Sequence, residues 1–388
     1  MKKFFYSLPS RLILSMIIGI TTGCYANNYL MRIIISIEKL LGAFIFLCTP
    51  FIVIGFIAPS ITKLGQKASK ILGFAFILAY FSSVGTALMS MFYGFKIIPY
   101  LNISSQIVKI NELPKMIFEI NIPPIMNVTS ALILSVIIGI AACWNKSKIT
   151  IKLLEEFHKI ILSIVIKIII PILPIFISCT FCSLSYEGII TKQLSVFAII
   201  VLLVILGQYI WLTILYTIAA VYSKKNSFNV LKYYGPAYLT ALGTMSSAAT
   251  LPVALECAKK SNILRKDIVD FGIPLFANIH VCGSVLTEVF FVMIVSQIYY
   301  GTLPSAKIMI LFCFLLGLFA VGAPGVPGGT AIASLGLIIS VIGFDNSATA
   351  LIITIFALQD SFGTACNITG DGALTLILTK YAQKHKIT

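Results

Sequence analysis

Long apolar stretches follow one another along most of this chain, and they limit its fold more than any other feature. They lie near residues 12–25, 33–58, 71–92, 123–144, 160–184, 195–222, 238–258, 271–299, 308–343 and 348–381. A helix of about 20 apolar residues crosses the hydrocarbon core of a bilayer. Hydrophobic residues make up 59% of the chain and charged residues 11%, whereas soluble domains are about one quarter charged. The pattern predicts an all-α polytopic membrane protein with one integral-membrane domain over residues 1–388.

Two of the stretches are interrupted by residues that do not continue a helix. Residues 243–252 read GTMSSAATLP, and residues 322–329 read GAPGVPGG. Broken backbone at membrane depth needs protein or a water-filled cavity to satisfy its free N–H and C=O groups. Two such segments in one half of a chain are typical of a transporter binding site. We therefore predict eight transmembrane helices and two re-entrant helical hairpins, near residues 228–260 and 305–343.

The basic residues of the chain test this topology. With eight spans, most of the 28 Lys and Arg residues fall on the side of the N-terminus, and loops rich in Lys and Arg mark the cytoplasmic side. Both termini are therefore expected in the cytoplasm. The same short clusters explain the net charge of +15 without a nucleic-acid partner.

The last apolar stretch carries four polar residues on one helical face: Asp360, Thr364, Asn367 and Asp371. Eleven steps of about 100° each exceed three full turns by only about 20°, so the first and last of these residues share a face. A carboxylate facing hydrocarbon costs about 2.5 to 3.5 kcal/mol, and two on one stripe are hard to retain unless the stripe lines a polar cavity. The stripe therefore indicates a solute or ion site.

Three segments of the second half carry a recognisable set of motifs: SSAATLP at 246–252, GVPGG at 325–329, and Asp360 followed by NITGD at 367–371. In order and spacing they resemble the signatures of the dicarboxylate/amino-acid:cation symporter family, which includes glutamate and aspartate transporters. The resemblance implies an elevator-type homotrimer in the lipid of a bacterial cytoplasmic (inner) membrane. The scaffold would come mainly from residues 10–60, 115–145 and 190–222, and the moving transport part mainly from residues 70–95, 150–186 and 228–380.

The resemblance also implies roles for single residues. Asp360 matches the position that binds the α-amino group of the substrate, and Asn367 the one that binds its α-carboxylate. Asp371 matches a cation ligand, with the Asn367 carbonyl beside it. The other residues that border the substrate would be Met245, Ser247, Ser284, Val326, Thr330 and Thr364. The gating residues of the hairpins would be Ser246, Gly325, Pro327, Gly328 and Gly329.

Two departures from the family pattern bear on the substrate. Acidic-amino-acid transporters carry an Arg one position before Thr364, or in some members at the position of Met245, to pair with the side-chain carboxylate. This chain has Gly363 and Met245 there, and a desolvated carboxylate without a partner is costly. We therefore predict a small neutral amino acid such as serine, threonine or alanine. An acidic amino acid or a dicarboxylate is the alternative.

Further departures bear on the coupling ion. The penultimate span reads HVCGS at 280–284 where the family has NMDGT. Cys282 therefore replaces a sodium-binding Asp, and His280, a candidate cation-binding residue, replaces an Asn that helps to form two cation sites. Ser82 and Ser83 match hydroxyl ligands of the deeper sodium site, but Ala79 replaces its Tyr. We expect that site to be lost, with sodium possible at Asp371. His280 and Glu288 are candidate proton carriers, because both can titrate near neutral pH when buried.

Two other classes of function, a protease and an ion channel, also use polar groups within membrane helices. An intramembrane aspartyl protease needs two carboxylates close enough to share a proton, but Asp360 and Asp371 lie about 16 Å apart along one helix. A substrate-gated ion channel stays open as an alternative, because broken helices also build pores. The sequence favours a non-enzymatic symporter that imports a small neutral amino acid with sodium and/or protons and uses no other cofactor.

Overall fold

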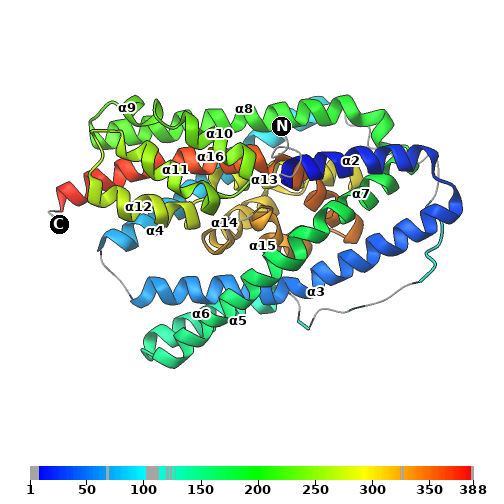
Figure 1. The fold of residues 1–388 in the computed structure, drawn as a ribbon, viewed down its shortest axis with the longest axis horizontal. Coiled ribbons are helices and arrows are strands. Elements are labelled where there is room, and N and C mark those ends of the chain that lie inside the picture. The colour runs from blue at the N-terminus through cyan, green and yellow to red at the C-terminus, as the bar shows by residue number, and fades with distance from the viewer. Residues whose placement is uncertain are drawn as a thin grey trace.

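The computed structural model describes residues 8–66, 70–101, 113–118, 122, 125–126, 128–323, 325 and 327–385. All regular structure in these residues is helical (Figure 1), so the predicted all-α class is confirmed. The α-helices are α2 (Leu8–Tyr25), α3 (Asn28–Gln66), α4 (Lys70–Ile97), α5 (Val128–Trp144), α6 (Lys148–Ile164), α7 (Ile170–Tyr186), α8 (Ile189–Ser223), α9 (Phe228–Leu231), α10 (Gly235–Thr244), α11 (Ser247–Lys259), α12 (Lys266–Ile279), α13 (Cys282–Tyr300), α14 (Ala306–Gly322), α15 (Gly329–Leu337) and α16 (Asn346–Lys384). Short turns of other helix types are η1 (Ile98–Leu101), η2 (Val165–Ile169) and η3 (Ile338–Ile342).

Five described segments are long and apolar enough to cross a membrane. They are Lys70–Leu101, Lys148–Tyr186, Ala198–Ser223, Lys266–Tyr300 and Asn346–Lys384. Shorter apolar helices include Ala306–Gly322 and Gly329–Ile342, which match the second expected hairpin. These helices support a membrane protein, while the count of eight spans with two re-entrant hairpins stays a prediction.

The first helices of the chain pack around α3 and α7. Helix α2 lies along α7, and α3 contacts α5, α6 and α7. Gly19 and Gly23 on α2 face the backbone carbonyls of Ser178 and Cys182 on α7, and a Cβ at either glycine would collide with them. Small residues at this four-residue spacing let two membrane helices approach closely. We call α2, α3, α5, α6 and α7 the first helix group.

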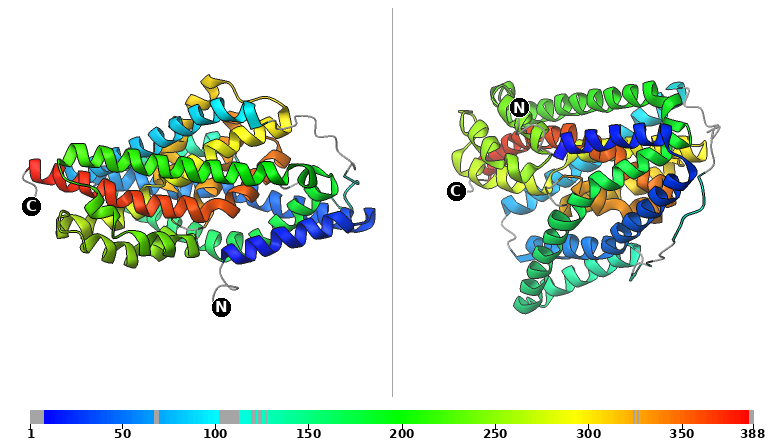
Figure 2. Two further views of the ribbon diagram at one scale, coloured as in Figure 1. Left: turned by 90° about the horizontal axis from the view of Figure 1, so that it is seen from above. Right: turned by 45° about the vertical axis from the view of Figure 1, so that its right-hand side comes forward.

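A second group of helices surrounds α13 and α16. Helix α13 packs between α4 and α16, and α16 also contacts α8, α10 and α12 (Figures 1 and 2). All of α13 is buried apart from Gln297, Tyr299 and Tyr300. A helix that is apolar on every side is typically covered by protein or lipid on every side. We call α4, α8 and α10–α16 the second helix group, and its core follows α13 and α16.

Two segments pack against helices of the other part than the one to which the sequence assigned them. Residues 150–186 form α6 and α7, which pack on α3, with α7 also on α2. Residues 190–222 form most of α8, which packs along α16. By packing, α8 lies with the helices expected to move, and α6 and α7 lie with those expected to stay in place.

Two pairs of short helices meet at their tips inside the second group. Hairpin 1 consists of α10 and α11, joined at Met245 and Ser246; hairpin 2 consists of α14, α15 and η3. The hydroxyl of Ser246 donates a hydrogen bond to the carbonyl of Gly325, 2.8 Å away, so the two tips touch. Hairpin 1 packs on α12 and α16, whereas α14 packs on α4, and α15 reaches α3 of the first group.

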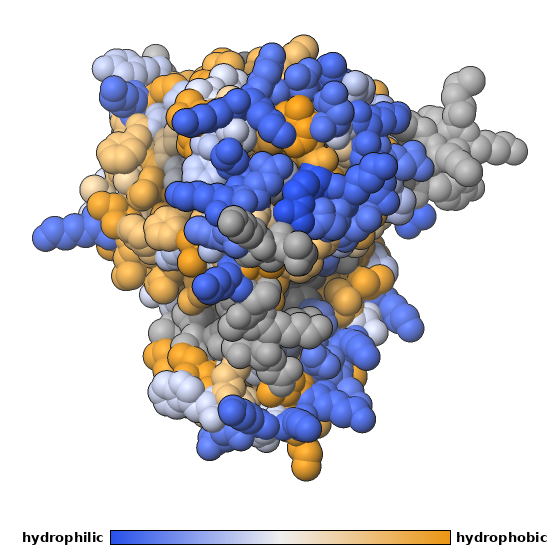
Figure 3. Space-filling view, turned by 90° about the vertical axis from the view of Figure 1, so that its left-hand side faces the viewer, coloured by the Kyte–Doolittle hydropathy of each residue, from blue (hydrophilic) through white to orange (hydrophobic). Residues whose placement is uncertain are grey.

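The end of the molecule at which α16 finishes is hydrophilic. Figure 3 shows hydrophilic residues over much of this face. Exposed lysines near the ends of α8, α11 and α16 and the start of α12 include Lys224, Lys225, Lys259, Lys260, Lys266 and Lys384. Such a concentration of positive charge is typical of the cytoplasmic side of a membrane protein.

Candidate functional site

The four residues of the polar stripe lie on α16 and are buried. Asp360 and Thr364 are each 4% exposed, Asn367 is 2% exposed and Asp371 is fully buried. The partners of Asp360, Asn367 and Asp371 come from the tip of hairpin 2, from α13, and from the break between α12 and α13, respectively. The stripe is therefore enclosed by protein along its whole length, whereas its role as a solute or ion site stays a prediction.

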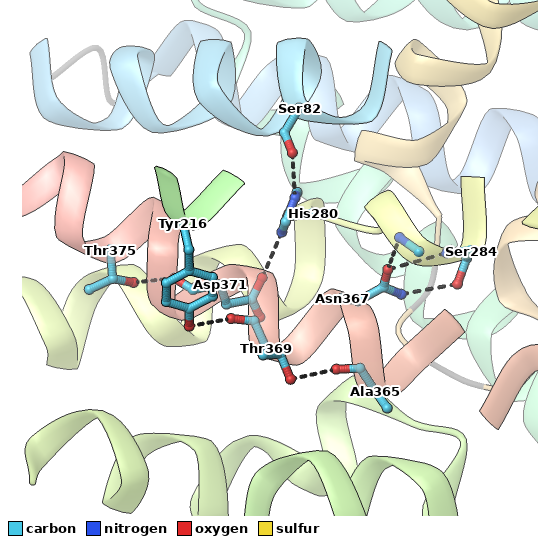
Figure 4. A network of polar contacts seen from close by, with 10 residues as sticks. Ser82, Tyr216, His280, Ser284, Ala365, Asn367, Thr369, Asp371 and Thr375 are labelled. Atoms are coloured by element: carbon cyan, nitrogen blue, oxygen red, sulfur yellow. Dashed lines mark hydrogen bonds and ion pairs between the residues drawn. The ribbon is translucent and has the colours of Figure 1, made fainter. Parts of the chain in front are cut away.

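The penultimate span is interrupted between α12 and α13, at His280 and Val281. Val281 occupies the N-cap position of α13, and its side chain offers no cap. The cap comes from Asn367 on α16 instead: its Oδ1 accepts from the Gly283 amide at 2.7 Å and the Ser284 amide at 3.3 Å. Its Nδ2 donates to Ser284 Oγ at 3.0 Å (Figure 4). Asn367 thus satisfies two of the free amides at the start of α13.

His280 joins α4 to α16 through its two ring nitrogens. Nε2 lies 2.9 Å from Ser82 Oγ on α4, and Nδ1 lies 2.9 Å from Asp371 Oδ1 (Figure 4). A neutral imidazole fits both contacts if Nδ1–H donates to Asp371 and the Ser82 hydroxyl donates to Nε2. Gly370 leaves room for the ring, because a Cβ there would lie 2.9 Å from His280 Cε1.

The order Ser82, His280, Asp371 is that of a hydrolase triad, but the surroundings are different. A triad serine must meet a substrate carbonyl next to donors that stabilise the oxyanion. Ser82 lies inside α4, which packs on α13, and both His280 and Asp371 are fully buried. The three side chains therefore connect three helices and present no nucleophile to solvent.

The second oxygen of Asp371 is available to a further partner. Within the described residues, Asp371 Oδ2 has no hydrogen-bond partner, and neither has the buried Ser83 Oγ. Tyr216 on α8 also contacts this part of α16 and donates to the Thr369 carbonyl at 2.8 Å (Figure 4). Hard cations prefer oxygen ligands, so the carboxylate oxygen of Asp371 fits the expected sodium ligand. His280 presents nitrogens that are already engaged and does not fit that role.

Asp360 contacts the tip of hairpin 2. Its Oδ2 accepts a hydrogen bond from the Gly328 amide at 2.6 Å. Gly328 has φ +70°, a left-handed conformation that glycine adopts without strain. Gly329 and Thr330 follow as the buried first residues of α15, and Pro327 is partly buried. Val326, the other expected substrate contact in this tip, lies outside the described residues.

The tip of hairpin 1 contacts the tip of hairpin 2. Ser246 caps α11 by accepting from the Ala249 amide at 3.2 Å, while its hydroxyl donates to Gly325. Met245 and Ser247, on either side of it, are 1% and 3% exposed. The structure therefore brings Asp360, both hairpin tips and the α13 start together, which the separate motifs could not show.

Gly363 lies against the start of α13. A Cβ at this position would lie 3.1 Å from Ser284 Oγ and 3.2 Å from Ser284 Cα. That spacing is tighter than ordinary van der Waals contact, so any side chain at position 363 would press on Ser284. The close packing of α13 against position 363 therefore favours glycine there.

Glu288 links α13 to hairpin 2. It is fully buried, and its Oε1 accepts a hydrogen bond from Ser334 on α15. Its Oε2 has no partner among the described residues. No hydrogen bond or ion pair joins it to His280 within the described residues, in keeping with their separation around the helix.

Sequence reasoning did not single out several residues around the site. Gln208 on α8 donates to Thr287 Oγ1 at 3.0 Å, and Thr287 donates to the Gly283 carbonyl at 2.9 Å. Tyr216, also on α8, bonds to α16 as described above. A glutamine inside an apolar stretch indicates a contact in the protein interior. Gln208 lies inside such a stretch, so the sequence contained this signal.

Comparison with known proteins gives one consistent result. The family model described as sodium:dicarboxylate symporter family matches residues 8–381. Excitatory amino acid transporter 2 from Homo sapiens is 28% identical over 228 residues, covering 57% of this chain and 39% of that protein. Excitatory amino acid transporter 3 from Homo sapiens is 32% identical over 161 residues, covering 42% of this chain and 30% of that protein. These matches span less than half of the relatives' own length. Because the family model covers nearly the whole chain, the chain belongs to the sodium:dicarboxylate symporter family.

Proposed function

We propose that this protein is a secondary active symporter that imports a small neutral amino acid, such as serine, threonine or alanine, together with sodium and/or protons. Members of its family are transporters and not enzymes, and the family name implies sodium as a coupling ion. The observation that carries the proposal is the buried Asp360 on α16, three residues before Gly363, with no arginine in an ion pair with it among the described residues.

Asp360 suits the ammonium group of an amino acid. It is a buried carboxylate, and within the described residues no Lys or Arg side chain forms an ion pair with it. A buried charge is stable only with a partner, and an ammonium supplies charge-assisted hydrogen bonds. A dicarboxylate without an amino group would place more negative charge beside Asp360. The carboxylate therefore favours amino acids over dicarboxylates.

A side-chain carboxylate on the substrate has no guanidinium to pair with. The chain has three arginines, Arg11, Arg32 and Arg265, near the starts of α2, α3 and α12. Arg32 donates to the Lys115 carbonyl, and Arg265 pairs with Asp267. Arginine is the usual partner of a buried carboxylate, because its planar fork binds both oxygens. This favours a neutral side chain on the substrate.

An acidic amino acid is the second candidate. The relatives described above are excitatory amino acid transporters by name. An acidic substrate would need another group in place of the missing arginine, and the Ser284 hydroxyl is the polar side chain closest to Gly363. A neutral hydroxyl is a weak substitute for a guanidinium, so this candidate ranks second.

We assign sodium coupling to one residue and proton coupling to two candidates. Sodium would bind at Asp371 through its second carboxylate oxygen, with the Asn367 carbonyl in the same site. Glu288 is the candidate proton carrier, because it is a fully buried carboxylate with only the Ser334 hydroxyl as partner in the described residues. His280 is the second candidate proton carrier, in contact with Ser82 and Asp371.

The packing suggests how the chain divides into a fixed and a moving part. We propose that the first helix group forms the scaffold and the second helix group the transport part, so α8 moves and α6 and α7 stay. This differs from the sequence-based expectation for residues 150–186 and 190–222. The assembly would be a homotrimer in a bacterial cytoplasmic membrane, with both termini in the cytoplasm.

Uptake into proteoliposomes tests the proposal. Purified protein is reconstituted and offered serine, threonine, alanine, aspartate, glutamate and succinate, under separately imposed sodium and proton gradients. We expect concentrative uptake of the neutral amino acids, driven by at least one of the gradients. Uptake of aspartate or succinate with none of the neutral amino acids would overturn the substrate assignment. Equilibration without accumulation would indicate a channel.

A further inference from the structure

Sulfur atoms gather where α2 ends, α3 begins and α7 ends, at the end of the molecule opposite the one where α16 finishes (Figure 1). The Cys182 thiol on α7 donates to the Met31 thioether on α3, with 3.6 Å between the two sulfurs. The two residues are 2% and 0% exposed. Met116 packs against the same pair. One thiol and two thioethers from three separate segments therefore meet in one buried place.

Two hydrogen bonds to α3 hold the backbone on either side of Met116. The carbonyl of the residue before it accepts from Arg32 Nε at 3.0 Å, and the amide of the residue after it donates to Ser36 Oγ at 2.9 Å. Arg32 directly follows Met31 on α3, and Ser36 lies about one turn further along. The segment that carries Met116 is therefore attached to α3 beside Met31, so the two thioethers are held close together.

These sulfur ligands suit a soft, monovalent metal ion. Thiolates and thioethers select Cu(I), whereas hard cations prefer oxygen. Structural zinc sites take four ligands, mostly from Cys and His, but no three His, Cys, Asp or Glu side chains are grouped as metal ligands in the part of the chain that the structure describes. One thiolate balances the charge of one Cu(I) ion, so the loaded site is neutral. Burial of a neutral site avoids the cost of an unpaired buried charge.

We propose that Cys182, Met31 and Met116 form a binding site for Cu(I). On binding, the S–H bond of Cys182 breaks and its proton leaves to water, while the thiolate and both thioether sulfurs bond to the metal. No electron is transferred. A thiol that coordinates a metal is deprotonated. Cys24 offers an exposed thiol next to the site, since its sulfur lies 3.2 Å from Ser185 Oγ, one turn from Cys182.

The metal site is separate from the proposed transport site. Its ligands lie on α3, on α7 and in residues 113–118, whereas Asp360 and Asp371 lie on α16. The proposal therefore does not depend on the identity of the transported substrate. Bound Cu(I) would tie three segments together at one end of the first helix group. Because the metal binds the folded site, it should raise the thermal unfolding temperature of the protein.

Competition for Cu(I) tests the site. The purified full chain is titrated with Cu(I), kept reduced by ascorbate without oxygen, against the colorimetric Cu(I) chelator bicinchoninate. We expect one tightly bound Cu(I) per chain, and X-ray absorption at the copper edge should show a shell of sulfur ligands. Cys182→Ser should abolish this binding, and Met31→Leu should weaken it about tenfold or more. Failure of the unmodified protein to compete with bicinchoninate would overturn the proposal.

Matched variants separate this site from the other sulfur atoms of the chain. Cys257→Ser on α11 and Met309→Leu on α14 remove a buried thiol and a buried thioether from the second helix group, and each should leave Cu(I) affinity unchanged. Met116→Leu should weaken binding as Met31→Leu does. Leucine nearly conserves the volume of methionine, so these two variants decide the matter if Cys182→Ser does not fold. Equal loss of Cu(I) in Cys257→Ser and Cys182→Ser, or unchanged affinity in both Met31→Leu and Met116→Leu, would show the assignment to be wrong.

Discussion

At the scale of single residues, the two buried carboxylates on α16 have different neighbours. Asp360 meets a backbone amide of hairpin 2, whereas Asp371 meets His280 from the break between α12 and α13. The first partner belongs to an element expected to open, and the second to the inside of the second helix group. This difference supports the proposed roles of Asp360 as a substrate contact and of Asp371 as a cation ligand.

Neutralising each carboxylate separately should distinguish these roles. Asp360→Asn removes the charge partner of the ammonium, so substrate affinity should fall by about tenfold or more at every sodium concentration and pH. Asp371→Asn should lower cation affinity instead, so raising the cation concentration should recover most of the uptake. Substrate titrations at several cation concentrations measure both effects. If added cation rescued both variants equally, the two roles would be misassigned.

Gly363 provides a second residue-scale prediction. Gly363→Arg introduces a guanidinium beside Ser284 and should shift preference from serine towards aspartate, because it can pair with the side-chain carboxylate. The new Cβ would press on Ser284, so total uptake should also fall. Gly363→Met, of similar length without charge, is the matched control. It should lose serine uptake without gaining aspartate uptake; a gain of aspartate uptake in both variants would show that size and not charge decides.

The sequence predicted the polar stripe on α16 because helical periodicity places its members on one face. It did not predict that His280 contacts Asp371, since the two are 91 residues apart. Their contact depends on where α12 ends and how α13 packs on α16. Local spacing carries no information about either distance.

At the scale of elements, the sequence predicted two of the three helix interruptions in the second half. The tips of both hairpins contain Gly, Pro or Ser residues that interrupt a helix. The break at His280 and Val281 has none of these at the interruption itself. Its cap comes from Asn367, 84 residues away from Gly283. A helix start that is capped by a distant helix leaves no signal in its own segment.

Asn367 should therefore act on stability as well as on binding. Asn367→Ala removes the acceptor for two amides at the start of α13, which should cost about 1 to 3 kcal/mol. Asn367→Asp keeps the acceptor and should retain more of that stability, while a second negative charge near Asp360 weakens substrate binding. Thermal unfolding and substrate titration of both variants measure the two effects. Equal stability of Asn367→Ala and the unmodified protein would contradict the capping role.

At the scale of the whole molecule, hairpin 2 lies at the boundary between the two helix groups. Its α15 contacts α3 and α5 of the first group as well as α16 of the second. The sequence-based division placed residues 150–186 in the transport part and residues 190–222 in the scaffold, but the apolar stretches 160–184 and 195–222 are apolar on most sides and lack a distinctive face that would have fixed their partners. Their partners became visible only in the packing of α7 on α2 and of α8 on α16. Glu288 lies at the contact between α13 and this boundary hairpin.

That placement gives Glu288 and His280 separable effects on coupling. His280 occupies one oxygen of Asp371, and Cys282 offers sulfur where the family pattern has a carboxylate, so few oxygen ligands remain for sodium. We expect a sodium reaction order no higher than about two, with part of the driving force supplied by a proton gradient.

Glu288→Gln should flatten the pH dependence of uptake while sodium-driven uptake persists, because the amide cannot change charge. His280→Asn should increase the dependence on sodium, because an amide oxygen replaces the engaged imidazole. Initial uptake rates against sodium concentration at several fixed pH values measure both, with the exposed Glu256→Gln on α11 as control. A third-order sodium dependence that is insensitive to pH, and unaltered by either substitution, would show that protons take no part and that the sodium sites are intact.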